Sequence, residues 1–273
     1  MSAVTGFATV KGANVVEPRI QRSQGETWPV VVSIVSHRHG PTVLSLLEQM
    51  AAQCASSVAR VVLTLNVPEP EFLPVARHWP FQLDIVSNTT PLGFSENHNR
   101  ALADATEPLV CVLNPDVVLL PGSDPFAELA LTVQTPGTGC AYPVQLDANG
   151  CVQDSERETP TPLALWRRRA LKRRETRVDW VNGACLVLPL QVWREMGGFD
   201  SAYFMYCEDV DLCLRVRLLG YRLQRSSARI EHQGMRASGH QWRHLAWHIT
   251  SLLRLWCSGV FWQACFGSLR RAP

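Results

Sequence analysis

Strongly apolar strands that alternate with helices are the feature that most constrains how this 273-residue chain can fold. The run from Pro29 to Ser36 is rich in β-branched residues, and Leu109 to Leu113 is equally apolar. Runs of this kind are typical of strands buried on both faces of a parallel sheet. Further elements are expected as strands over 59–65 and 81–86 and as helices from Pro41 and over 95–105. The alternation predicts an α/β fold with a mostly parallel central sheet flanked by helices.

Beyond residue 120 the expected elements are shorter and partly antiparallel. A hairpin is predicted over 142–152, because Asn149-Gly150 favours the conformations of a tight turn. Residues 153–178 are polar and basic, which predicts a mobile loop or a short helix that could act as a lid. The remaining expectations are strands over 181–188, 221–224 and 228–231 and helices over 190–196 and 208–219.

Three regions are predicted along the chain. Residues 1–27 are polar and unpatterned and are expected to form a flexible arm, residues 28–235 a single α/β domain, and residues 236–273 an aromatic, amphipathic helical segment. The apolar content of 46% and charged content of 18% are typical of a globular protein. A net charge of +2 requires no nucleic-acid partner.

The cysteines and the start of the chain bear on its location. Nine cysteines without a CxxC pair favour neither a disulfide framework nor a zinc site. The first residues lack a basic region followed by an apolar stretch, so no signal peptide is expected. A reducing cytoplasm fits these features best.

Three carboxylates within Glu208–Asp211 stand at the start of an apolar helix, directly after an aromatic run. A helix N-terminus stabilises carboxylates, whereas apolar surroundings raise their pKa and make them better proton acceptors. Asp211 and Arg215 have the spacing of a surface ion pair and are assigned to structure. Glu208 is either a capping residue or a catalytic one. Asp209 has no obvious local partner and is the preferred general base, with helix capping as the alternative.

Asn114-Pro115-Asp116 follows an apolar strand, at the place where open α/β sheets bind ligands. An aspartate there could hold Mg²⁺ or Mn²⁺ against a diphosphate. The tripeptide is also common turn chemistry, and on the tripeptide alone the turn is favoured. His232 follows a short strand and is either structural or a second metal ligand, and an imidazole ligand would favour manganese.

Two other stretches have alternative interpretations. The segment from Gly93 to Asn99 could line a nucleotide or sugar pocket, or it could simply be a helix start capped by Ser95. The C-terminal segment contains Trp242, Trp247, Trp256 and Trp262 among aliphatic and basic residues. It suits a membrane interface, packing on the domain's own core, or contact with a second subunit in a homodimer. The basic run at 167–174 would attract anionic lipid or a pyrophosphate-linked acceptor.

The order of these motifs resembles the inverting glycosyltransferases of family 2, which have the GT-A fold, and within them the rhamnosyltransferase-like branch. The resemblance covers roughly residues 29–235. It is carried jointly by Val31 to Ser36, Gly93-Phe94 with Asn97 and Asn99, Asn114-Pro115-Asp116-Val117, Val181 to Ala184, Gly198-Phe199-Asp200, Phe204 to Arg215, and His232.

The resemblance implies a nucleotide-sugar donor, a divalent metal and a glycan or lipid-linked acceptor of the cell envelope. Asp116 matches the last acid of the family's metal motif, His232 a histidine that often completes it, and Asp209 the catalytic base beside Glu208. Donor contacts are expected from Ser36, His37, Arg38, Gly93, Phe94, Asn97, Asn114, Asn182 and Gly183.

The chain departs from the family pattern at two positions. Many relatives have an aspartate at the end of the second strand that reads the nucleotide base, but residues 62–66 contain no acid. Asn114 replaces an aspartate of the metal motif, which should weaken metal binding. The alternative is therefore a catalytically weak or inactive sugar-nucleotide-binding module of the same fold. A nucleotidyltransferase is disfavoured because Ser36 to Gly40 has only one glycine, and no nucleic-acid partner is expected.

Overall fold

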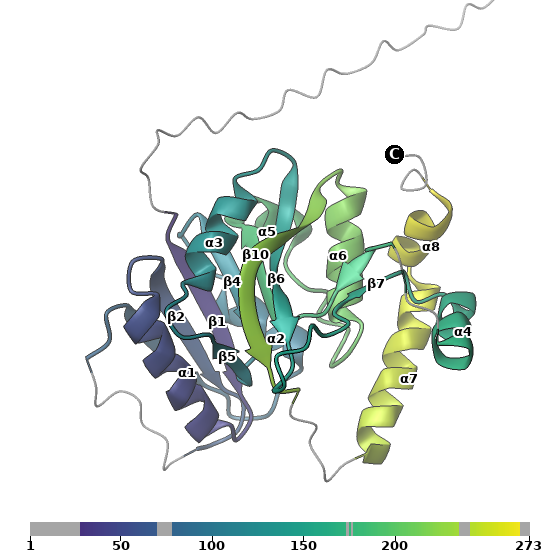
Figure 1. Cartoon of the computed structure of the whole chain (residues 1–273). Helices are drawn as coiled ribbons and strands as arrows, with labels where there is room; N and C mark the ends of the chain where they lie inside the picture. Colours follow the sequence, from purple (N-terminus) through teal and green to yellow (C-terminus); the bar gives the residue numbers. More distant parts are fainter. Residues whose placement is uncertain (1–27, 70–77, 173–174, 176, 235–240, 268–273) are drawn as a thin grey trace, which may run out of the picture.

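One eight-stranded sheet forms the centre of the molecule. The computed structural model describes residues 28–69, 78–172, 175, 177–234 and 241–267 (Figure 1). The predicted arm at 1–27 lies outside these residues. The strand order is β3-β2-β1-β4-β9-β6-β10-β5. The strands are β1 (Val30–Ser36), β2 (Val58–Leu65), β3 (Gln82–Ser87), β4 (Leu109–Leu113), β5 (Val117–Leu119), β6 (Thr138–Leu146), β9 (Cys185–Pro189) and β10 (Arg222–His232).

Six of these strands run in the same direction. β1 pairs in parallel with β2 and β4, β2 pairs in parallel with β3, and β6 pairs in parallel with β10. β9 is antiparallel to both β4 and β6, and β5 is antiparallel to β10. The prediction of a mostly parallel sheet with an antiparallel portion is confirmed. The carboxyl ends of β1, β2, β4 and β10 consequently lie along one edge of the sheet.

Helices cover both faces of the sheet. Helices α1 (Gly40–Gln53) and α3 (Pro125–Val133) pack on one face with Leu46, Met50 and Phe126 among the buried residues. Helices α2 (Phe94–Ala101), α5 (Leu190–Met196) and α6 (Glu208–Leu218) pack on the other with Leu102, Trp193 and Leu212. The buried strand residues alternate between these two clusters, as Val31 and Val32 do, because successive side chains of a strand point to opposite faces.

Several elements differ from the sequence-based expectations. Residues 138–146 form a central strand rather than only the start of a hairpin, although Leu146 and Val152 do form one antiparallel bridge across the Asn149-Gly150 turn. Residues 222–232 form one strand whose register shifts between Arg225 and Arg229, where two strands were expected. The expected strand at 181–188 divides into β8 (Trp180–Val181) and β9, and β8 pairs with β7 (Glu156–Arg157) in a second sheet.

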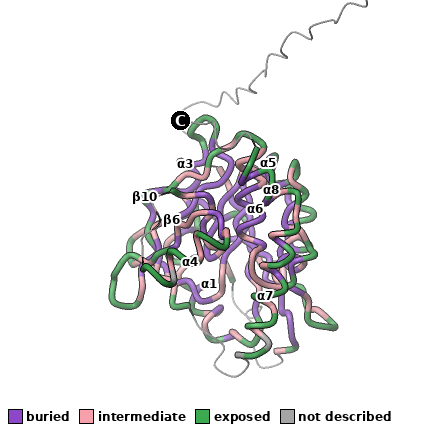
Figure 2. The backbone as a smooth tube through the Cα atoms, turned by 90° about the vertical axis from the view of Figure 1, so that its right-hand side faces the viewer, coloured by how far each residue is buried: buried purple, intermediate pink, exposed green. Residues whose placement is uncertain are grey.

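The predicted loop or short helix at 153–178 contains β7 and α4 (Pro162–Leu171), with Thr161 capping the helix through a 3.1 Å bond to the Ala164 amide. The C-terminal segment forms α7 (Gln241–Cys257) and α8 (Gly259–Phe266). Figure 2 shows α7 and α8 beside α6, with a mixture of buried and exposed residues. No helix within the described ranges has the length and apolar character needed to cross a bilayer.

Candidate functional site

Asp209 lies in the first turn of α6, where the backbone presents amides to its carboxylate. Its Oδ2 accepts a 3.2 Å hydrogen bond from the Gly183 amide and its Oδ1 a 2.8 Å bond from its neighbour Val210. Burial raises the pKa of Asp209 to about 6, while these amides and the charge of Arg157 oppose the shift. Such a carboxylate is ionised near neutral pH yet basic enough to accept a proton.

The turn that precedes α6 has an unusual backbone conformation. Tyr206 and Cys207 have φ angles of 72° and 64°, which residues other than glycine rarely adopt. Glu208 follows them and is buried, and its Oε2 has no hydrogen-bond partner within the described residues. Burial, followed by the charge of Asp209, raises the pKa of Glu208 well above its usual range. Glu208 is therefore harder to ionise than an exposed carboxyl group, and its catalytic role remains a prediction.

Asp211 has the structural role assigned from its spacing. Its Oδ2 accepts a 2.7 Å ion-paired hydrogen bond from Nε of Arg215, four residues along the helix. Nη1 of Arg215 also donates to the carbonyl oxygens of Met196 and Gly198, at 2.9 and 2.8 Å. The pair therefore fastens α6 to the end of α5.

Asp116 and His232 form the candidate metal centre. Asp116 precedes β5, and His232 pairs in register with Val117 at the end of β10, so the two strands bring both side chains together. His232 Nε2 lies 3.5 Å from Asp116 Oδ1, and both side chains are largely buried. A carboxylate oxygen beside an imidazole nitrogen is a donor set that suits Mn²⁺. No group of three or more His, Cys, Asp or Glu ligands occurs in the part of the chain that the structure describes. A bound ion would take its other ligands from phosphate and water.

The turn at 182–184 connects the predicted base to the predicted metal motif. The Asn114 amide donates a 2.8 Å bond to the Ala184 carbonyl, and the amide of the preceding residue, Gly183, donates to Asp209. Asn182 donates from Nδ2 to Gln145 Oε1 at 2.9 Å, which fixes the turn on β6. Asn114 and Asp209 are thus each one hydrogen bond away from the same short turn.

Gly93 and Phe94 pack against the segment that leads to the base. The Phe94 amide donates a 2.8 Å bond to the Phe204 carbonyl, and a Cβ on Gly93 would lie 2.6 Å from that same oxygen. A Cβ on Gly183 would lie 3.6 Å from Asp209 Cβ and 3.7 Å from Phe94 Cζ. Gly93 therefore allows the close approach of the backbone at Phe204, whereas a Cβ at position 183 would make ordinary van der Waals contacts with Asp209 and Phe94.

Asn97 and Ser95 differ from what their positions suggested. Gly93, rather than Ser95, is the N-cap of α2, and Ser95 is fully buried. Asn97 donates a 2.9 Å bond to the Gly93 carbonyl and accepts a 2.7 Å bond from Asn88. Both ends of the Asn97 amide are therefore engaged within the protein, where they hold the Gly93 turn in place.

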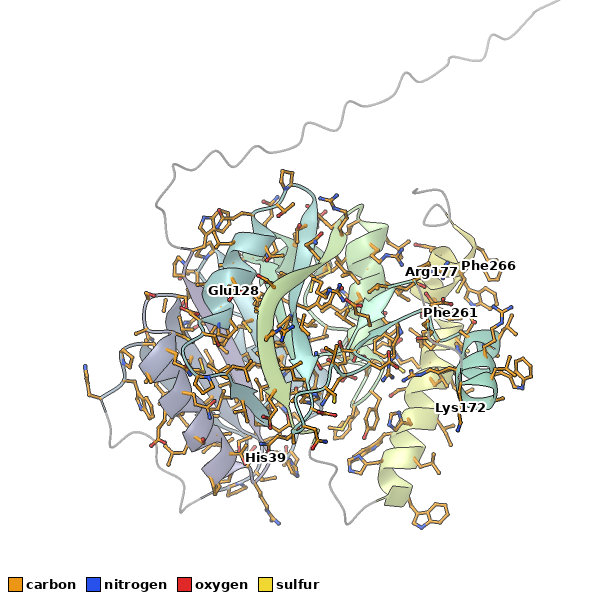
Figure 3. All side chains as sticks on the ribbon, in the orientation of Figure 1. His39, Glu128, Lys172, Arg177, Phe261 and Phe266 are labelled. Carbon is orange, nitrogen blue, oxygen red and sulfur yellow. The ribbon has the colours of Figure 1, made fainter. Side chains whose placement is uncertain are left out.

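Ser36 ends β1, and His37 and Arg38 follow it in the loop at the edge marked by His39 in Figure 3. Glu69, which the sequence analysis missed, organises this loop. It accepts hydrogen bonds from the Ser36 hydroxyl at 2.5 Å, the Arg38 amide at 2.9 Å and the Gly40 amide at 3.0 Å. A carboxylate does lie near the end of the second strand, three residues later than expected, and it binds backbone amides of the chain itself. The exposed side chains of His37 and Arg38 remain open to a ligand.

Arg157 is a second residue that the sequence analysis missed. It lies on β7, its guanidinium carbon is 5.4 Å from the centre of the Trp180 ring, and its charge lowers the pKa of Asp209. Burial lowers the pKa of Arg157 itself. A two-residue strand in a polar stretch has no periodicity that would have revealed it.

Comparisons with known proteins agree with this architecture. A profile of the glycosyltransferase-like family 2 matches residues 28–248. The N-acetylglucosaminyl-diphospho-decaprenol L-rhamnosyltransferase of Mycobacterium tuberculosis is 33% identical over 188 residues, which span 58% of this chain and 61% of that protein. Rhamnosyltransferase WbbL of Escherichia coli K12 is 28% identical over 216 residues, which span 71% of this chain and 79% of WbbL.

Solved structures share the fold. The mannosyltransferase PcManGT from Pyrobaculum calidifontis, in complex with GDP-Man and Mn2+, superposes with a TM-score of 0.58 at 18% identity, over 82% of this chain and 64% of that one. S. aureus TarS 1-349 superposes with a TM-score of 0.57 at 12% identity, over 87% and 72%. The profile spans most of the chain, and the sheet, the flanking helices and the motif order match it, so this protein is a member of glycosyltransferase family 2.

Proposed function

We propose that this chain is a metal-dependent inverting glycosyltransferase, which moves a sugar from a nucleoside-diphosphate donor to an acceptor hydroxyl. The observation that carries the proposal is the setting of Asp209. Its carboxylate has a pKa of about 6 and is oriented by the Gly183 amide, and position 183 borders both Asp209 and the Phe94 ring. The same turn hydrogen-bonds the strand end that leads to Asp116.

Asp209 would act as the general base in a single displacement. The acceptor oxygen attacks the anomeric carbon, its proton passes to Asp209, and the bond from that carbon to the diphosphate oxygen breaks on the opposite face. The nucleoside diphosphate leaves with the bonding electrons, and the anomeric configuration inverts. General-base assistance contributes on the order of 10²–10⁴-fold in rate. Phe94 and the Phe204 backbone would help to exclude water from this position.

Asp116 and His232 would hold Mn²⁺ or Mg²⁺ on the diphosphate. A bound divalent ion supplies charge neutralisation of the leaving group. Asp116 provides the carboxylate and His232 the imidazole, and the loop of Ser36, His37 and Arg38 contributes to donor binding from the adjacent strand end. Asn114, Asn182 and Gly183 would line the pocket between the metal and Asp209.

The donor and acceptor classes are inferred from the relatives. Two similar proteins are named as rhamnosyltransferases, and one of them takes a diphospho-decaprenol substrate. We therefore propose a nucleotide-linked sugar such as rhamnose as donor and a lipid-linked or cell-envelope glycan as acceptor. Such an acceptor would place the protein in the cytoplasm, on the inner face of the cytoplasmic membrane.

A panel of nucleotide sugars tests the proposal. The full chain is incubated with each donor and with short lipid diphosphate-linked saccharides, with and without Mn²⁺. Release of nucleoside diphosphate and the anomeric configuration of the product are then measured. We expect metal-stimulated release with one donor and a product of inverted configuration. Donor binding without any release would favour the inactive binding module, and a retained configuration would remove Asp209 from its role.

A further inference from the structure

Helices α4, α7 and α8 lie along one side of the molecule (Figures 1 and 2). None of the three contains an Asp or Glu, although the whole chain has 24 acidic residues. They are also rich in tryptophan and arginine. A layer without carboxylates on one side of the protein indicates a surface selected for a partner of negative charge.

Helix α7 presents two different faces. Its inner face includes buried Leu255, which packs in a cluster with Tyr203, Leu214 and Phe261. Its outer face is an exposed apolar stripe at helical spacing. The stripe consists of Trp242, Leu245, Ile249 and Leu253, which are 84%, 48%, 50% and 52% exposed. A stripe of this kind on the solvent side of a helix is typical of an interaction surface.

Helices α4 and α8 also carry exposed apolar residues. Trp256 of α7 donates from Nε1 to the Pro160 carbonyl at 2.8 Å, which fixes the start of α4 beside α7. The exposed apolar residues of the two helices are Leu163, Trp166 and Leu171 on α4 and Trp262 and Phe266 on α8. Phe266 and Lys172, at the ends of α8 and α4, are both labelled on this side in Figure 3.

Basic side chains accompany these apolar residues. Arg167 and Lys172 are exposed on α4 and at its end. Of the acids near these helices, Asp154 pairs with Arg168 at 3.0 Å and Asp200 with Arg254 at 3.5 Å. Tryptophan and aliphatic residues interspersed with Arg and Lys suit the boundary of an anionic bilayer.

We propose that the outer faces of α4, α7 and α8 form a docking surface for an anionic lipid bilayer. This deepens the proposed function, which requires a lipid-linked acceptor to reach Asp209. The inner face of α7 contacts the segment before Glu208: the Tyr206 hydroxyl lies 2.7 Å from His244 Nδ1, and the Phe204 and Trp247 rings are 5.0 Å apart. Only the thickness of α7 separates the bilayer from the segment that leads into the base.

Vesicle sedimentation of the full chain, without any donor, tests the surface. Vesicles of phosphatidylcholine alone are compared with vesicles that also contain phosphatidylglycerol, at low and high salt. We expect binding that requires phosphatidylglycerol and weakens with salt. The double variant Leu245→Glu/Ile249→Glu should bind at least tenfold more weakly, with Leu131→Glu on α3 as the matched control, because Leu131 is 67% exposed outside this surface.

Removing the basic residues provides a second variant. Arg167→Ser/Lys172→Ser should weaken binding by about tenfold or more, since each basic residue near an anionic surface contributes about 1 kcal/mol. The control is Arg229→Ser, because Arg229 is an exposed residue of β10, away from these helices. Circular dichroism would verify that each variant is folded.

Either of two vesicle results would overturn the proposed docking surface: no binding by the wild type, or binding by the Leu245→Glu/Ile249→Glu variant that equals that of the wild type. A dimer that this variant abolishes while vesicle binding persists would show that the surface contacts a second copy of the chain instead. Transfer to a short water-soluble acceptor without vesicle binding would reject the surface and retain the function. Vesicle binding without transfer to any acceptor would reject the function and retain the surface.

Discussion

The two ends of the candidate site are built on opposite principles. Around the ends of β1 and β2, polar side chains are paired with backbone: Asn66 donates to the Leu92 carbonyl at 3.0 Å and accepts from the Leu92 amide at 2.8 Å, and Glu69 accepts three hydrogen bonds. At the start of α6, Glu208 is buried with an unpaired oxygen, and Asp209 has a raised pKa.

This difference separates the end that fixes the shape of the site from the end that supplies groups for proton transfer. The β1–β2 end satisfies its polar groups and thereby fixes loops in one conformation, which suits recognition of a donor. The α6 end keeps carboxylates where they are costly to ionise, which suits proton transfer and lowers stability. Removing a polar side chain should therefore lower stability at the β1–β2 end, whereas removing a carboxylate at the α6 end should lower turnover and raise stability.

Asp209→Asn is expected to have the largest effect. The variant keeps the size of the side chain but loses the proton acceptor, so turnover should fall by about 10²–10⁴-fold while donor affinity is unchanged. Steady-state kinetics and calorimetric donor binding measure both. Asp200→Asn, at a side chain that is 41% exposed, is the control. Near-normal turnover of Asp209→Asn would erase the proposed distinction.

Asp116→Ala should reduce metal-dependent affinity for the nucleoside diphosphate by roughly ten- to a hundredfold, because one of two protein ligands is lost. Calorimetry with and without Mn²⁺ measures the difference. Asp104→Ala, at a side chain that is 79% exposed, is the matched control. If Asp116→Ala binds the diphosphate as wild type does in Mn²⁺, the metal assignment is wrong.

Asn66→Ala tests the end that is built for shape. It should cost about 1–3 kcal/mol of unfolding free energy, because the Leu92 amide loses its partner and the Leu92 carbonyl keeps only the 3.2 Å bond from Asn97. Urea denaturation measures the loss, and Asn149→Ala in an exposed turn should be nearly neutral. A neutral Asn66→Ala would mean that this network contributes no rigidity.

The smallest expected effect is a change of folding stability with pH, caused by the ionisation of Asp209. The pKa of Asp209 is about 6 in the folded protein and lower in the unfolded chain, so the folded state binds the proton more tightly. Stability should therefore fall as pH rises from about 4 to 6, whereas turnover should rise through the same range. Asp209→Asn lacks the ionisation penalty.

Thermal unfolding of both proteins across this pH range checks the expectation. Asp209→Asn should be more stable than wild type at pH 8, by at most the roughly 3 kcal/mol that a shift of about two pKa units represents, and the difference should vanish near pH 4. A stability difference that is constant with pH would show that Asp209 ionises as easily in the folded protein as in the unfolded chain.

The parallel half of the fold was predictable because its sequence signals are local. Val30–Ser36 and Leu109–Leu113 are continuous apolar strands, and both were confirmed. Thr138–Leu146 was missed as a central strand because Gly139, Pro143 and Gln145 interrupt its apolar pattern. Strands at 221–224 and 228–231 were expected separately, but β10 continues through Ser226 and Ser227 with a register shift.

The site was predictable only in part. The spacing of Asp211 and Arg215 identifies their ion pair directly, because both partners lie on one helix. The contact between Asp116 and His232 joins residues far apart in the sequence, and before the family resemblance a second metal ligand was only one of two alternatives for His232. Glu69 had no such signal, since its partners begin 33 residues earlier and two of them are backbone amides.

The conformation of Tyr206 and Cys207 has a consequence for how the start of α6 can change. Two consecutive residues in the left-handed region strain the backbone, and stacking of the Tyr206 ring on His248 of α7 holds them in this conformation. Cys207→Gly would relieve this backbone strain without changing any carboxylate. The orientation of the base thus depends on a helix that contributes no atom to the reaction, and mutational drift in that helix would alter catalysis from a distance.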